Sequence, residues 1–79
     1  MRAASLVAQS EIEGLCRGWE QHTVFRLANG DAWEVTAPRS RQWFAHDPLV
    51  RIWRFRAGYM LEIEGANEVL PVRRKQPAN

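Results

Sequence analysis

Hydrophobic and polar residues alternate along most of this chain, which is the period of β-strands rather than of helices. The clearest case is residues 23–35, TVFRLANGDAWEV, where a nearly alternating segment meets Ala28-Asn29-Gly30 and a second segment returns with Trp33 at its centre. Turn-forming residues between two such segments predict a β-hairpin. We take this hairpin as the unit around which the rest of the chain is organised.

The length of the turn decides which side chains meet across the hairpin. A two-residue turn would place Phe25 opposite Glu34, whereas a three-residue loop with Gly30 in the left-handed region places Phe25 opposite Trp33. We expect the second register, because it gathers the apolar residues on one face and because glycine adopts a positive φ without steric cost. The predicted buried face consists of Thr23, Phe25, Leu27, Trp33 and Val35.

Before the hairpin, the pattern predicts a strand over residues 10–17. Ile12 and Cys16 share one face of this strand, and Gly14 between them indicates a bulge or a bend through which one strand could serve two sheets. Residues 1–9 show no strong period, so we expect a loose N-terminal segment, with a short helix over residues 3–8 as the alternative.

After the hairpin, residues 36–48 lack a clean period and contain Pro38 and Pro48, which predicts a long loop. Loops of this length are more often functional or mobile than structural. The loop carries Trp43 and Phe44, which either cap one end of the fold or present an aromatic contact surface.

The C-terminal half predicts three more strands, at residues 49–55, 59–64 and 68–73, with turns at 54–58 and 65–67. Because Pro71 lacks an amide hydrogen, its backbone nitrogen should face an edge or an unpaired site. Alternation assigns outward positions to Arg51, Trp53, Met60, Glu62 and Glu64, and inward positions to Val50, Ile52, Tyr59, Leu61, Ile63, Leu70 and Val72.

Five or six short strands with no helical period predict an all-β fold, namely a small SH3-like barrel of antiparallel strands. An OB-fold is the second choice, because the helix expected between its central strands is not evident. We assign residues 10–74 to a single barrel domain and residues 75–79 to a polar tail.

Composition adds few constraints on function. The chain has 79 residues and a net charge of +2, and its basic residues are almost all arginine, which permits contact with nucleic acid without requiring it. The single cysteine, Cys16, excludes an intrachain disulfide, and we expect a buried thiol. No apolar run is long enough to span a membrane and the start is too short for a secretory signal, so we expect a cytoplasmic protein without a membrane partner.

The motifs TVFRLANGDAW and DPLVRIWRFRAGYMLEIEG, between a Gly-Trp pair and a Val-x-Arg ending, resemble those of a group of small uncharacterised bacterial domains. The similarity covers residues 12–74, and it implies a small SH3-like barrel with no assigned catalysis, often preceded by a secretory signal. Two features depart from that group: no signal is evident here, and the Trp43-Phe44 pair lies outside the pattern. The matching residues are Gly18, Trp19, Thr23, Phe25, Leu27, Asn29, Gly30, Trp33, Asp47, Pro48, Val50, Ile52, Gly58, Tyr59, Leu61, Val72 and Arg74.

Residues suited to catalysis or metal binding are few and scattered. Cys16, His22 and His46 are the only candidates for a thiol and imidazole pair, and nothing in their spacing joins them. With Asp47 they form no metal-ligand spacing, and no glycine-rich phosphate loop is present. We therefore expect no catalytic residues, no metal and no cofactor.

The most suggestive segment for binding is RIWRFRAGY, where arginines interleave with aromatic residues. Aromatic residues and arginine are enriched at interface hot spots, which favours a non-catalytic interaction module that contacts a protein partner or another copy of itself. The alternative is a barrel that binds single-stranded RNA or DNA, since bases stack on aromatic rings and arginines meet phosphates. The predicted contact residues are Trp43, Phe44, Arg51, Trp53, Arg54, Phe55 and Arg56.

Overall fold

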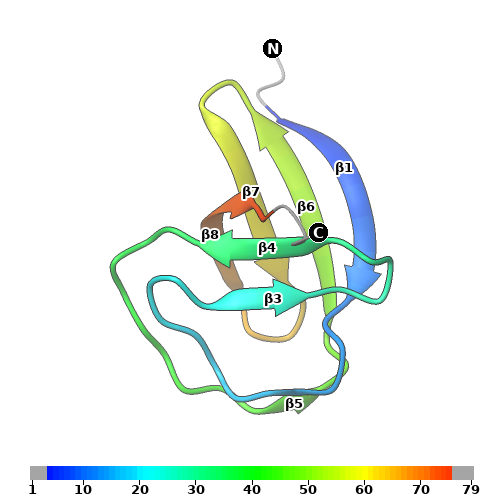
Figure 1. The fold of residues 1–79 in the computed structure, drawn as a ribbon, viewed down its shortest axis with the longest axis vertical. Coiled ribbons are helices and arrows are strands. Elements are labelled where there is room, and N and C mark those ends of the chain that lie inside the picture. The colour runs from blue at the N-terminus through cyan, green and yellow to red at the C-terminus, as the bar shows by residue number, and fades with distance from the viewer. Residues whose placement is uncertain (1–3, 76–79) are drawn as a thin grey trace.

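The computed structural model describes residues 4–75 and contains eight strands and no helix within that range (Figure 1). Four strands precede the loop region that begins at residue 36: β1 (Ala4–Glu11), β2 (Leu15–Cys16), β3 (Val24–Arg26) and β4 (Ala32–Val35). The other four are β5 (Ala45–His46), β6 (Leu49–Phe55), β7 (Gly58–Ile63) and β8 (Glu68–Arg74).

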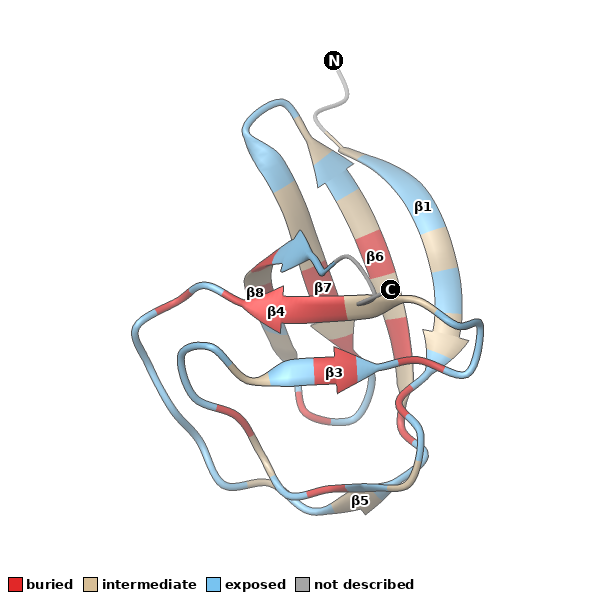
Figure 2. Cartoon of the chain, in the orientation of Figure 1, coloured by how far each residue is buried: buried red, intermediate tan, exposed pale blue. Residues whose placement is uncertain are grey.

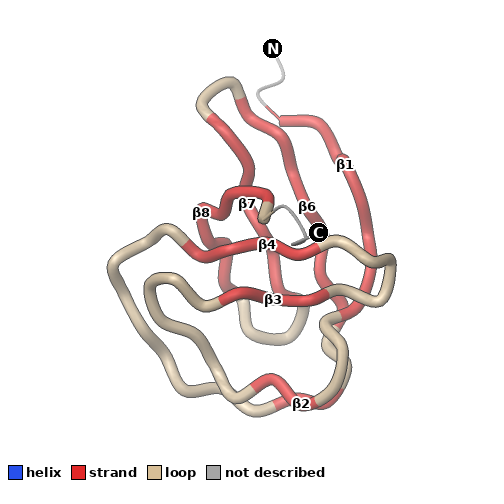
Figure 3. The backbone as a smooth tube through the Cα atoms, in the orientation of Figure 1, coloured by secondary structure: helices blue, strands red, loops and turns tan. Residues whose placement is uncertain are grey.

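Six of the strands form one antiparallel sheet in the order β1-β6-β7-β8-β4-β3, and the short strands β2 and β5 form a separate pair (Figure 3). The chain meanders through β6, β7 and β8, and β8 then pairs with β4 of the earlier hairpin. The two edges of the large sheet are therefore β1 and β3.

A short antiparallel bridge between Ile12 and Leu27 joins these two edges. On either side of the bridge, the Glu13 amide donates to the Arg26 carbonyl at 2.9 Å and the Ala28 amide donates to the Glu11 carbonyl at 2.8 Å. The sheet thus closes on itself at one end, which satisfies backbone groups that an open edge would expose. The predicted fold class, a small all-β barrel of antiparallel strands, is confirmed.

The central hairpin has the predicted register, with Phe25 opposite Trp33. The Leu27 amide donates to the Asp31 carbonyl at 2.9 Å, which closes the three-residue loop, and Gly30 has a φ of 96°. Asn29 holds the loop through its side-chain oxygen, which accepts from the Asp31 amide at 2.9 Å. Of the expected buried face, only Thr23 is partly exposed.

The interior of the barrel is filled by the inward residues of every long strand except β1 (Figure 2). Trp33 is fully buried at its centre, and Cys16 is buried as predicted. The inward positions predicted for β6, β7 and β8 are all buried except Tyr59, which is partly exposed and packs against the core. The buried core residues include Ile12, Trp19, Phe25, Leu27, Val35, Val50, Ile52, Leu61, Ile63, Leu70 and Val72.

The prediction of a loose segment at residues 1–9 is wrong for its described part, since β1 begins at Ala4, and the alternative helix is wrong for the same reason. A β-bulge explains the missing period: Leu6 pairs with Trp53 and Ala8 with Ile52, so Val7 is an extra residue. Such a residue shifts the alternation by one position. Residues 1–3 lie outside the described range.

Three other predicted boundaries change. The strand expected at residues 10–17 is interrupted at Gly14, where φ is 82°, and its halves join different sheets, as the glycine suggested. The loop expected at residues 54–58 shrinks to a turn of two residues, because β6 extends through Phe55 and β7 begins at Gly58. The turn after β7 spans residues 64–67 rather than 65–67.

The region 36–48 is a loop that contains β5, and it is tied to the segment before the hairpin. Trp19 and Arg41 exchange two backbone hydrogen bonds of 3.0 Å. Pro71 sits where β4 has ended, and its carbonyl accepts from the Thr36 amide at 3.0 Å. The proline therefore lies at the end of the β4 ladder, in agreement with the sequence prediction. Of the predicted polar tail, only Lys75 is described, and its amide donates to the Ala32 carbonyl at 2.9 Å.

The close approach of the two loops at Gly18 is open to a direct test. A side-chain carbon at Gly18, where φ is 113°, would overlap the backbone carbonyl of Arg41, whereas one at Gly14 would meet no atom within 4 Å. Both substitutions by alanine place a side chain at positive φ, at a cost of about 1–2 kcal/mol. We expect Gly18→Ala to lower the free energy of unfolding by at least about 2 kcal/mol more than Gly14→Ala, because of the overlap. Urea denaturation of both variants measures this difference, and equal losses would contradict it.

Candidate functional site

The outer face of the large sheet carries a row of apolar side chains across four strands. Met60 of β7 pairs with Trp53 of β6 on one side and with Pro71 of β8 on the other, and Trp53 also pairs with Leu6 of β1. Leu6 is 51% exposed, and the other three are partly exposed. Together with two apolar neighbours on the same face, this row is termed the outer apolar face: Leu6, Trp53, Phe55, Met60, Val69 and Pro71.

The side chains around Trp53 are held in place by polar contacts. The Trp53 indole Nε1 donates to Glu62 Oε1 at 2.9 Å, which fixes the ring across β6 and β7. Next along β6, Arg51 Nε donates to Gln9 Oε1 at 3.2 Å, and its guanidinium lies 3.5 Å from Glu64 Oε1. The outer apolar face is therefore built on paired strands and has an ordered tryptophan at its centre.

A hollow of about 430 Å³ opens beside the outer apolar face, where β6 turns into β7. No heavy atom lies within 4 Å of the position that a side-chain carbon of Gly58 would occupy. Phe55, Met60 and Pro71 line the hollow together with Arg73. It is mostly apolar with a basic rim.

Cations and aromatic rings stack at the same end of the barrel. The Arg54 guanidinium lies 5.8 Å from the Tyr59 ring centre, and Tyr59 packs 4.9 Å from Trp33. Arg74 lies 5.2 Å from the Trp33 ring centre and forms an ion pair of 2.9 Å with Asp31. The buried Trp33 Nε1 has no hydrogen-bond partner within the described structure, so burial of the indole is the main contribution of this side chain.

The seven contact residues predicted from the sequence do not form one surface. Arg51, Trp53 and Phe55 lie on or beside the outer apolar face, and Arg56 is in the turn at its end. Arg54 pairs with Tyr59 on the opposite side of β6 and stacks on its ring. Trp43 and Phe44 lie at the other end of the barrel, next to β5, whereas the turn between β6 and β7 is at the top of Figure 1.

Trp43 caps the barrel at its end, which is one of the two alternatives for the pair. Its ring centre lies 6.4 Å from that of Trp19, and its edge lies 3.5 Å from the position that a side-chain carbon of Gly65 would occupy. Phe44 is 65% exposed and stands apart from the outer apolar face.

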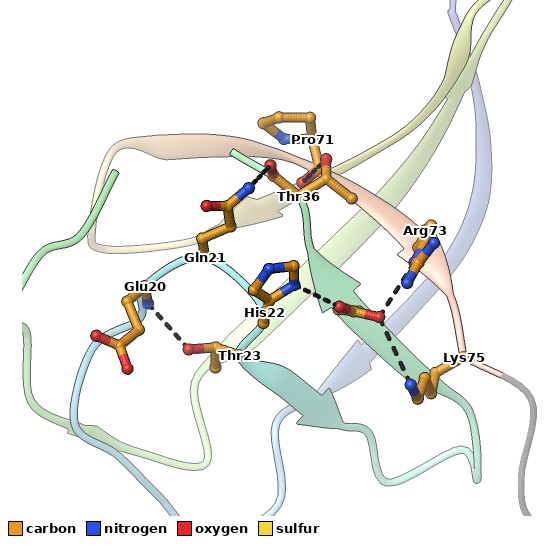
Figure 4. Close-up of polar contacts among 9 residues, drawn as sticks. Glu20, Gln21, His22, Thr23, Thr36, Pro71, Arg73 and Lys75 are labelled. Atoms are coloured by element: carbon orange, nitrogen blue, oxygen red, sulfur yellow. Dashed lines mark hydrogen bonds and ion pairs between the residues drawn. The ribbon is translucent and has the colours of Figure 1, made fainter. Parts of the chain in front are cut away.

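A buried carboxylate that the sequence did not reveal lies on the outer side of β4 (Figure 4). Glu34 accepts from His22 Nδ1 at 2.9 Å and from Arg73 Nε at 3.1 Å, and Lys75 Nζ lies 3.7 Å away. These contacts, first the hydrogen bond from His22 and then the one from Arg73, lower the pKa of Glu34 below its ordinary value. The hairpin register correctly places Glu34 on the outer side, but its cover comes from a loop residue at positive φ, His22, and from β8.

The candidate catalytic residues are not assembled into a site. Cys16 is buried, whereas His46 is exposed on the opposite face of the small β2-β5 sheet and pairs with Asp47 at 3.2 Å. Within residues 4–75, no group of three or more His, Cys, Asp or Glu side chains could hold a metal ion. The same range holds no helix long and apolar enough to cross a membrane.

No protein-family model matches the chain, and no curated protein or solved structure shows significant similarity to it. The resemblance to small bacterial domains therefore stays a prediction. What the chain does must be inferred from its own surface.

The Glu34 cluster predicts a pH dependence of stability. Because the pKa of Glu34 is lowered on folding, the charged carboxylate stabilises the native state above the ordinary value of 4.5, and this contribution is lost as the pH falls through the folded-state value. We expect Glu34→Gln to lower the melting temperature at pH 7, with the deficit narrowing below pH 4.5. Thermal unfolding followed by circular dichroism measures this, with Glu13→Gln as the exposed control. A deficit that stays constant as the pH falls would contradict the assignment.

Proposed function

We propose that this chain is a non-catalytic interaction module that binds another protein chain through its outer apolar face. One observation carries the proposal: four adjacent strands place Leu6, Trp53, Met60 and Pro71 in a continuous row on the side of the sheet that faces away from the core. A monomer gains nothing from exposing these residues together, because apolar surface is stabilised by removal from water.

The composition and rigidity of this face support the proposal. Tryptophan, methionine and arginine are enriched at the centres of protein interfaces. Trp53 is already fixed by its bond to Glu62, so binding would cost little side-chain ordering at this position. The hollow beside Gly58 adds a concave site for one side chain of a partner. Cys16 and His46 face opposite sides of the β2-β5 sheet, which gives no support to a catalytic function.

A phage-displayed peptide library tests the proposal. We expect selection on the full chain to enrich peptides with apolar residues, whose affinity falls at least tenfold in Leu6→Asp because a buried contact is replaced by a charge. The matched control is Leu15→Asp, because Leu15 on β2 is also 51% exposed but lies outside the outer apolar face. Isothermal titration of the enriched peptides measures both affinities. Equal binding of the enriched peptides to both variants would refute the proposed surface.

A specific observation keeps single-stranded nucleic acid as a second candidate ligand. Arg54 and Arg56 form no ion pair with any acidic residue in the described range. Arg54 stacks on Tyr59 and Arg56 follows Phe55 in the turn, and both of these aromatic residues line the hollow. Unpaired guanidinium groups next to aromatic rings suit phosphates and stacked bases.

Tryptophan fluorescence separates the two ligands, because the chain has four tryptophans. If the second candidate holds, mixed single-stranded RNA and DNA should quench the emission at low salt. The effect should largely disappear at high salt, because release of counterions from the phosphates then contributes less to binding. Arg56→Gln should then weaken binding several-fold, while Arg17→Gln, which removes an exposed arginine beside β2, should have a smaller effect. No change in emission at either salt concentration would exclude these ligands.

A further inference from the structure

The outer apolar face lies between two regions of opposite charge. At the end where β6 turns into β7 are Arg56 and, on β8, Arg73, with Lys75 beyond it. At the other end, β7 presents Glu62 and Glu64, and Glu11 lies across the sheet on β1 next to Leu49. Arg51 offsets one negative charge at the acidic end, and Glu34 offsets one positive charge at the basic end. The acidic end therefore stays negative and the basic end stays positive.

This arrangement is complementary to itself under one rotation only. If two copies pack face to face about a two-fold axis that lies between the sheets and across the strands, the basic end of each copy meets the acidic end of the other. If the axis runs along the strands, like charges meet. A two-fold contact uses the same patch on both copies, so a face that is apolar in its middle and oppositely charged at its ends satisfies it.

The bulge in β1 argues for contact through the face rather than through the edge of the sheet. β1 is an edge strand along most of its length, but the extra residue Val7 interrupts its regular spacing of backbone groups. A bulge in an edge strand hinders the addition of a further strand. Sheets that pack face to face have no such requirement, because only their side chains interdigitate.

We propose that the occupant of the outer apolar face is a second copy of this chain, packed face to face with its strands antiparallel to those of the first. The inference rests on the proposed function and names the partner at that surface. It also fits the size of the chain, because a domain of 79 residues buries a small share of its surface alone and gains from a second layer.

Sedimentation velocity across a range of protein concentrations tests the association. We expect a concentration-dependent dimer for the wild-type chain, a dissociation constant raised at least tenfold in Leu6→Asp, and no more than a twofold change in the control Leu15→Asp. Circular dichroism and urea denaturation establish that both variants are folded. A chain that stays monomeric at millimolar concentration, or equal effects of the two substitutions, would overturn the inference.

A charge exchange tests the orientation. Arg56→Glu and Glu64→Arg should each weaken the dimer about fivefold, because each places like charges together at both symmetry-related ends, and the double variant should recover most of the affinity. If both single substitutions weaken the dimer and the double variant does not recover its affinity, the antiparallel arrangement is overturned.

The two proposals fail separately. If the chain is monomeric but selected peptides bind at Leu6 and not at Leu15, the self-association is refuted and the interaction module stands. If neither association occurs, both are refuted.

Discussion

The bridge between Ile12 and Leu27 is the contact on which the rest of the structure depends. It joins the two edges of the six-stranded sheet and converts a curved sheet into a barrel. Closure gives Trp33 a fully enclosed site, so the hairpin's largest side chain is buried from every side. It also commits one face of each strand to the interior, which leaves the opposite face of β6, β7 and β8 as the surface available for contact.

Much of this arrangement follows from local sequence. The Ala28-Asn29-Gly30 loop fixes the hairpin register, since only the three-residue loop buries Phe25 and Trp33 together, and the structure has that register. Alternation in β6 and β7 likewise orients Ile52 and Leu61 inward, because the period of two acts within each strand. The N-terminal strand escaped prediction because one extra residue breaks its period.

The contact surface could be predicted only in part, because the period of two gives the face of a residue within its own strand but not the neighbouring strand. Trp53 and Phe55 lie on one strand, so their shared face is readable from the sequence. That Leu6 lies beside Trp53 depends on a pairing between residues far apart in the chain, and no local pattern encodes it. The position of Trp43 could not be predicted either, because a loop without a period does not indicate which side chains face inward. In the structure its ring packs against Trp19.

The bulge at Val7 determines which side of the sheet its two neighbours face. On one side of it, Leu6 points away from the barrel, and on the other, Ala8 packs against the core. With regular alternation, two positions separated by one residue would face the same side of the sheet. The extra residue therefore places Leu6 and Ala8 on opposite sides of the sheet although they are only two positions apart. Without Val7, Leu6 and Ala8 would be direct neighbours in a regular strand, with Leu6 still opposite Trp53, and β1 would present an uninterrupted edge to which a further strand could add.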